Sequence, residues 1–201
     1  MVVTFVILAL VTKTFLFQAF IIPSASMQNT LQVGDRVLVD KLSPWFGGEP
    51  DRGDVVVFHD PGGWLGAPGI GSSAEPEASG IRTALSALGF VPPPGNEYLI
   101  KRVIAVGGDT VECRRSEPVK VNGRALAEPY IAPGATPCDN FPVGVVKVPK
   151  DHLWVMGDNR DNSLDSRYQQ LRHPGAGFVP VDLVAGRAFT VAWPVGHWSG
   201  L

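Results

Sequence analysis

Two short segments of this 201-residue chain carry the residue types that catalysis by side chains requires. The first spans residues 23–31, where the hydroxyl groups of Ser24 and Ser26 stand two positions apart. The second spans residues 157–167, a dense run of Asp, Asn, Arg and Ser directly after an apolar stretch. On composition alone, the first also suits a turn, and the second suits a solvated loop or a weak calcium loop. Calcium is disfavoured because the Asp and Asn spacing does not match an EF-hand loop and two arginines would repel a cation.

Common catalytic motifs are absent from the sequence. It contains no Gly-x-Ser-x-Gly, no His-Glu-x-x-His and no Gly-x-x-x-x-Gly-Lys. The four histidines are scattered, and none lies in a segment that resembles a triad partner: His59, His152, His173 and His197. If a nucleophile exists here, its base is therefore not expected to be histidine.

Short strands must position these segments. The chain has 23 Gly and 18 Pro, which suits many strands and turns better than long helices. β-rich apolar runs predict strands at residues 36–39, 55–58, 98–106, 145–148, 153–156 and 188–193, and Asn122-Gly123 predicts a hairpin within 119–126. We therefore predict a mostly β protein of antiparallel sheets.

The N-terminal residues 1–22 are apolar apart from a few polar positions, and Lys13 is their only charge. We predict that residues 1–14 are the C-terminal part of a membrane-spanning helix that begins upstream of Met1, and that residues 15–22 leave the membrane as an extended strand. A cleaved signal peptide is the alternative, but the basic segment that should precede its apolar run is missing.

Residues 15–201 are then expected to form a β-rich domain outside the cytoplasm. A Gly/Pro/Ser/Ala-rich insertion at about residues 61–96 interrupts it, as a surface insertion or as a lid, with a short helix suggested at 81–90. Trp45, Phe46 and Trp64 are candidate anchors at the membrane interface. Lys and Arg total 17 against 19 Asp and Glu, a net charge of −2, which argues against a nucleic-acid partner.

Four segments occur in one order along the chain: 23–31, then Gly-Asp-Arg-Val-Leu-Val at 34–39, Lys-Arg-Val-Ile-Ala-Val-Gly-Gly-Asp at 101–109 and Gly-Asp-Asn-Arg-Asp-Asn-Ser at 157–163. Their order and spacing resemble the bacterial type I signal peptidases, membrane-bound serine proteases of the Ser–Lys kind. The closing Gly-Arg-Ala-Phe at 186–189 and Trp193-Pro194 look like the end of that family's sequences. The resemblance runs from about residue 15 to 201, with 61–96 outside it.

The resemblance implies a role for each matching residue. Ser26 matches the nucleophile and Lys101 the general base, whose apolar neighbours would desolvate the amine and lower its pKa. The Ser24 hydroxyl would join the Ser26 backbone N–H in the oxyanion hole, and Ser163 would orient the lysine amine. Four residues match supporting ion pairs: Arg102, Asp158, Asp165 and Arg167. The family usually has proline where this sequence has Asn29.

The resemblance also implies the substrate, secretory preproteins cut after small residues in an Ala-x-Ala pattern on the outer face of the bacterial cytoplasmic membrane. An extended substrate could pair between residues 17–23 and 97–101. Five residues would wall its shallow apolar pockets: Phe20, Ile22, Met27, Leu99 and Ile100. The expected partners are signal-peptide-bearing preproteins and the lipid bilayer, with no nucleic acid and no cofactor.

Two other readings stay open at this point. One is a self-cleaving Ser–Lys peptidase of the repressor type, which would need a DNA-binding helix-turn-helix that the sequence does not display. The other is a catalytically inactive, membrane-anchored β-scaffold that only binds partners.

The two cysteines, Cys113 and Cys138, cannot form a disulfide-dense scaffold or a four-cysteine zinc site, and no metal is expected. A lone pair in an oxidising compartment commonly forms a bridge, and two separate buried thiols are the alternative. Both cysteines are remote in sequence from Ser26 and Lys101. We therefore expect a bridge to stabilise the domain without taking part in catalysis.

Overall fold

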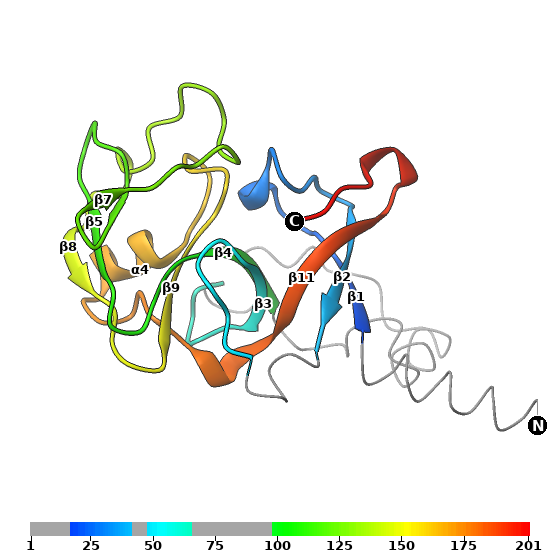
Figure 1. The fold of residues 1–201 in the computed structure, drawn as a ribbon, viewed down its shortest axis with the longest axis horizontal. Helices are drawn as coiled ribbons and strands as arrows, with labels where there is room; N and C mark the ends of the chain where they lie inside the picture. Colours follow the sequence, from blue (N-terminus) through cyan, green and yellow to red (C-terminus); the bar gives the residue numbers. More distant parts are fainter. Residues whose placement is uncertain (1–16, 42–47, 66–97) are drawn as a thin grey trace, which may run out of the picture.

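The structure, a computed structural model, describes residues 17–41, 48–65 and 98–201. Its larger sheet has seven strands in the order β1-β2-β11-β3-β4-β9-β10 (Figure 1). In chain order these strands are β1 (Phe17–Ile21), β2 (Arg36–Asp40), β3 (Val55–His59), β4 (Tyr98–Val106), β9 (His152–Met156), β10 (Val179–Pro180) and β11 (Val184–Trp193). All neighbouring strands of this sheet pair antiparallel.

A second sheet of four strands, in the order β7-β6-β5-β8, is also antiparallel. Its strands are β5 (Thr110–Cys113), β6 (Lys120–Val121), β7 (Arg124–Ala125) and β8 (Gly144–Lys147). The described helices are short: η1 (Ala25–Met27), α4 (Ser166–Arg172), η2 (Val181–Leu183) and η3 (Val195–His197). In Figure 1 the second sheet and α4 lie at one end of the molecule, and β1, β2 and the end of β11 lie at the other.

The predicted fold class, mostly β with antiparallel sheets, is confirmed for the described residues. Each predicted strand has a counterpart within one to four residues, and β4 has the predicted bounds. The predicted hairpin is also present, because β6 and β7 are joined by Asn122 and Gly123 with φ of 51° and 77°. Two positive φ values are what a tight hairpin turn requires, and Asn-Gly adopts them at little cost.

β4 is the strand on which the site depends. It has nine residues, seven of them buried. β3 pairs with its first half and β9 with its second half, and its apolar side chains pack into three different clusters. A strand buried on both faces is normally a continuous apolar run. Lys101 and Arg102 interrupt this run at its centre, and both side chains are buried. Burying two basic side chains in the middle of a core strand costs free energy unless specific partners compensate for it.

Several expectations fall outside the described residues. These are the membrane helix at 1–14, the anchors Trp45 and Phe46, the short helix at 81–90 and residues 66–96 of the insertion. Within the described ranges, no helix combines the length and the apolar character needed to cross a bilayer.

Trp64 does not behave as the predicted interfacial anchor. Only 4% of the residue is exposed. Its ring packs edge-on against Phe58 with centroids 5.8 Å apart, and its Nε1 donates a hydrogen bond to the carbonyl of Ala176 at 3.1 Å. The apolar surface of the indole is buried and its N–H is hydrogen-bonded inside the protein, so Trp64 belongs to the core.

The two cysteines form a disulfide in the structure. Cys113 ends β5 and Cys138 lies in the loop before β8, with 5.4 Å between their Cα atoms and 25 positions between them in sequence. Both are fully buried, in the same apolar cluster as Trp154. The bridge therefore ties the end of a long segment, residues 113–138, to the end of β5, an inner strand of the second sheet.

Replacing both cysteines should destabilise the domain. Closing a loop of this length stabilises a protein by about 3 kcal/mol in the chain-entropy model. We expect the Cys113→Ser/Cys138→Ser variant to lose about that much free energy of unfolding in urea titrations. Dithiothreitol should bring the wild type to the same value and leave the variant unchanged. Equal stability of the oxidised wild type and the variant would contradict this expectation.

Candidate active site

Ser26 sits in the helical turn η1, directly after the edge strand β1. Backbone hydrogen bonds fix the connection, from Ile22 N–H to Asp35 O and from Gly34 N–H to Ile22 O, both 2.9 Å. Ser26 is 8% exposed. The nucleophile expected from the sequence is thus held on a short, well-anchored turn rather than on a loose loop.

Lys101 reaches Ser26 from β4. Its Nζ donates a hydrogen bond to Ser26 Oγ at 2.5 Å, and the lysine is only 4% exposed. Burial lowers the pKa of Lys101 from 10.5 to about 8, against the charges of Asp165 and Asp158, which raise it; Arg167 lowers it further. The neighbours in β4 that the sequence analysis expected to desolvate the amine are all buried: Leu99, Ile100, Val103 and Ile104.

Ser24 also reaches the site. Its hydroxyl lies 3.3 Å from Ser26 Oγ, within hydrogen-bond distance. Unlike Ser26, Ser24 is exposed, so its hydroxyl stands on the solvent side of the dyad.

Ser163 does not make the expected hydrogen bond to Lys101. Its Oγ is buried near the Asp165 carboxylate, whose pKa a hydrogen bond from the Ser163 hydroxyl helps to lower. The hydroxyl lies against Gly157 instead, where an added Cβ would stand 2.3 Å from it. The structure therefore brings Ser163 beside the site without joining it to the amine.

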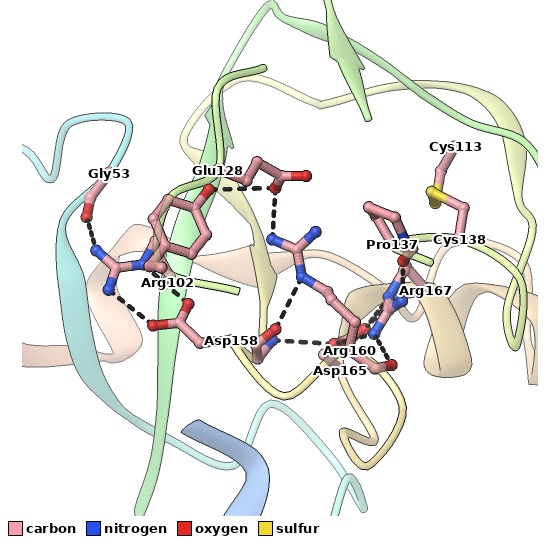
Figure 2. Close-up of polar contacts among 12 residues, drawn as sticks. Gly53, Arg102, Cys113, Glu128, Pro137, Cys138, Asp158, Arg160, Asp165 and Arg167 are labelled. Carbon is pink, nitrogen blue, oxygen red and sulfur yellow. Dashed lines mark hydrogen bonds and ion pairs between the residues drawn. A yellow bond between two sulfur atoms is a disulfide. The ribbon is translucent and has the colours of Figure 1, made fainter. Parts of the chain in front are cut away.

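The four residues expected in ion pairs form two of them. Arg102 binds Asp158 with both ends of its guanidinium, Nε to Oδ1 at 2.9 Å and Nη2 to Oδ2 at 2.7 Å. Arg167 binds Asp165 in the same way, at 2.9 and 2.8 Å (Figure 2). All four side chains are nearly or fully buried.

The Asp165 carboxylate also organises the chain around it. It caps α4 by accepting the N–H of Arg167, and it accepts the Gly157 N–H at 3.0 Å. Burial alone would raise the pKa of Asp165, but the charge and hydrogen bonds of Arg167 and the Gly157 N–H hold it below its ordinary value. Asp165 thus stays ionised next to a buried amine.

Two residues that the sequence analysis gave no role hold the nucleophile turn against the 157–167 loop. The Asn159 N–H donates to Ser26 O at 3.1 Å, and the Asn159 side chain donates to Ala25 O at 3.0 Å. Gly157 leaves room for the turn, because a Cβ there would lie 2.4 Å from Ser26 O. Their place in the polar segment was the only signal, and it did not reveal these contacts.

Four of the five expected pocket residues gather in one apolar cluster beside η1: Phe20, Ile22, Met27 and Ile100. Leu99 joins a different cluster, with Val56 and Phe58. Beside the first cluster, the rings of Phe20 and Tyr98 meet edge-on at 5.0 Å, which brings β1 close to the start of β4.

The turn after the nucleophile explains the departure from proline. Asn29 has φ of 77°, and the N–H groups of Thr30 and Leu31 return to Met27 O at 3.1 and 2.8 Å. Proline is locked near −65° and cannot adopt this conformation, whereas asparagine is among the residues that tolerate it best. The turn is therefore held by its own backbone bonds.

The sequence matches the family model described as signal peptidase, peptidase S26, over residues 1–193. The chain belongs to this family. Family S26 consists of serine proteases, so the protein is an enzyme of that class.

Curated relatives agree with this membership. A signal peptidase I of Mycobacterium tuberculosis (strain CDC 1551 / Oshkosh) is 44% identical over 211 residues, which cover 96% of this chain and 71% of that protein. A probable signal peptidase I of Mycobacterium leprae (strain TN) is 42% identical over 214 residues, 95% of this chain and 73% of that protein. A solved signal peptidase I of Enterococcus faecalis V583 gives a TM-score of 0.43 at 24% identity, covering 69% of this chain and 96% of that one.

A methyl group at Gly157 should disable this signal peptidase family member. In Gly157→Ala the new Cβ would press on Ser163 Oγ and Ser26 O, so the nucleophile turn must move. We expect kcat for a preprotein to fall by about tenfold or more, since small misplacements of reacting groups are costly. Gly196→Ala is the matched control, because nothing lies within 4 Å of a Cβ at Gly196. A wild-type rate in Gly157→Ala would show that this packing does not hold the site.

Proposed function

We propose that this chain removes signal peptides from secreted preproteins with Ser26 as the nucleophile and Lys101 as the general base. The observation that carries the proposal is the 2.5 Å hydrogen bond from Lys101 Nζ to Ser26 Oγ at a buried site. With a pKa of about 8, about a tenth of the amine is neutral at pH 7, against fewer than one in a thousand for an unperturbed lysine. Only the neutral amine can accept the serine proton.

The reaction follows from these positions. Ser26 Oγ attacks the scissile carbonyl carbon while Lys101 Nζ takes its proton. The protonated amine then gives that proton to the departing nitrogen, which leaves an acyl-enzyme on Ser26. A water molecule, deprotonated by the same amine, hydrolyses the ester. Lys101 acts as base and acid in turn, and no metal or cofactor has a part in these steps.

The negative charge of the tetrahedral intermediate needs donors on the exposed side of Ser26. The Ser24 hydroxyl is one, at 3.3 Å from Ser26 Oγ. The backbone N–H of Ser26 is the other, because the first N–H groups of a helix lack acceptors inside it. One such donor is worth roughly 3–4 kcal/mol to the transition state.

The substrate backbone would add a strand between β1 and β4. β1 is the edge of the larger sheet, and β9 pairs with β4 only from Arg102 onward, so residues 99–101 have no strand on that side in the described part. The apolar cluster of Phe20, Ile22, Met27 and Ile100 would then face the residues before the scissile bond. A wall of packed side chains admits small residues, which supports cleavage after an Ala-x-Ala pattern.

We further propose that residues 1–14 belong to a membrane helix and that residues 15–201 form the peptidase domain on the extracytoplasmic side of the bacterial cytoplasmic membrane, with an insertion at about 61–96. Exposed apolar side chains at one end of the larger sheet support a lipid bilayer as a partner: Phe17, Ile21, Phe189, Trp193 and Trp198. Ile21 and Trp193 both flank Arg36 of β2, so they share one face. Exposed tryptophans next to apolar residues are typical of membrane interfaces.

Cleavage of a preprotein by the purified protein tests the proposal. Ser26→Ala and Lys101→Met should each abolish cleavage, because neither half of the pair works alone. Ser199→Ala and Lys147→Met, at exposed positions, are the matched controls and should cleave normally. Substantial activity in Lys101→Met would overturn the mechanism. Binding without cleavage by the wild type would favour a scaffold, and cleavage of itself alone would favour a repressor-type peptidase.

The pH profile should report the lysine. Because the base must be neutral, kcat/KM should rise with pH through an apparent pKa of about 8 and then level off. Lys147→Met should give the same profile. A rate that keeps climbing past pH 10 would mean that the amine is not desolvated.

A further inference from the structure

The disulfide-bridged segment 113–138 touches the 157–167 loop at two buried points. Glu128 Oε1 accepts a hydrogen bond from Arg160 Nη2 at 2.5 Å, with 4% and 0% of the two side chains exposed. Pro137, next to the bridged Cys138, accepts a hydrogen bond from Arg167 Nη1 at its carbonyl oxygen (Figure 2). The segment is therefore fastened to the loop that carries the carboxylates around Lys101.

The two arginines shape that loop from inside. Arg160 Nε donates to Gly157 O at 2.9 Å, and Arg167 Nη2 donates to Arg160 O at 3.0 Å. Gly157 is in turn the residue against which Ser26 O and Ser163 pack. A shift of Arg160 would consequently move Gly157 and, through it, the turn that carries Ser26.

A second contact runs from the same segment to the strand of the base. The Tyr130 hydroxyl donates to Glu128 Oε1 at 3.2 Å, and the Arg102 guanidinium lies over the Tyr130 ring, 4.2 Å from its centroid. Arg102 follows Lys101 in β4 and binds Asp158. Glu128 thus stands where the connections from β4 and from the 157–167 loop meet.

Arg160 depends on Glu128. Burial alone would lower the pKa of Arg160, but the hydrogen bond and the charge of Glu128 raise it. The Nη1 atom of Arg160 is already without a hydrogen-bond partner in the described part of the chain. A buried cation that loses its counter-charge is strongly destabilised. Without Glu128, the guanidinium must therefore turn toward solvent and give up its bond to Gly157.

We propose that Glu128 is a positioning residue for peptide-bond cleavage, and that the Cys113–Cys138 bridge serves catalysis by holding Glu128 against Arg160. The inference rests on the proposed function of the Ser26–Lys101 pair. The sequence analysis expected a purely stabilising bridge, because the cysteines are far in sequence from Ser26 and Lys101. In the structure, Glu128 and Pro137 of the bridged segment contact the 157–167 loop beside these two residues, which gives the bridge a second role.

The test compares Glu128→Gln, Glu128→Asp and Glu117→Gln in the otherwise intact protein. Glu117 lies in the same bridged segment and forms a partly exposed ion pair with Lys120 at 2.7 Å, which makes it a matched control. Kinetics on a preprotein are measured well below each unfolding midpoint. Glu128→Gln should lower kcat by about 10- to 100-fold with KM within about twofold. Glu128→Asp, which keeps the charge, should recover part of the loss, and Glu117→Gln should match the wild type.

A wild-type kcat in Glu128→Gln, whatever its unfolding midpoint, overturns the proposal, as does an equal loss of kcat in Glu117→Gln. A wild type that cleaves no preprotein overturns the proposed function instead. The bridge is tested separately with Cys113→Ser/Cys138→Ser, which remains available if Glu128→Gln does not fold. It should lower kcat, and adding Glu128→Gln should lower kcat little further. Losses that simply multiply would show that the bridge and Glu128 act independently.

Discussion

Burial of one amine, that of Lys101, is the constraint around which the site is built. Lowering its pKa from 10.5 to about 8 means that the charged amine destabilises the fold by about 3 kcal/mol. The penalty is fully present below about pH 8, where the amine is charged in the folded and unfolded states. It disappears as pH rises to 10.5, since the amine is then neutral in both. A protein keeps such a group in its core where a neutral amine is needed.

The charges around the amine are balanced so that it is not stabilised as a cation. Asp165 and Asp158 each raise the pKa of Lys101, and Arg167 lowers it. Each carboxylate is bound at both oxygens by its own arginine, Arg167 or Arg102. A guanidinium beside each carboxylate offsets part of the negative charge near Lys101. The ion pairs thereby let desolvation decide the state of the amine while they fix the 157–167 loop.

Local sequence patterns predicted the features that depend on neighbouring residues, namely the strands, a turn and the motif residues. The alternating and continuous apolar runs located the strands, Asn122-Gly123 located a hairpin, and four ordered motifs selected Ser26 and Lys101. Contacts between distant segments were not predictable in the same way. Glu128 lies in a stretch without strand pattern, so its pairing with Arg160 depends on the fold of the bridged segment. Trp64 was predicted at a membrane interface and is buried instead. Its burial depends on Phe58 and Ala176, and the sequence pattern alone does not show that these residues lie beside it.

The pKa of the Lys101 amine tests the central claim most directly. A ¹⁵N NMR titration of the lysine side chains in Ser26→Ala, with Lys101→Arg to assign the resonance, reports that amine without catalysis. A midpoint near 8 is the result expected from burial. A midpoint near the ordinary 10.5 would contradict the account, because the amine would then be a solvated cation at neutral pH and could not serve as the base.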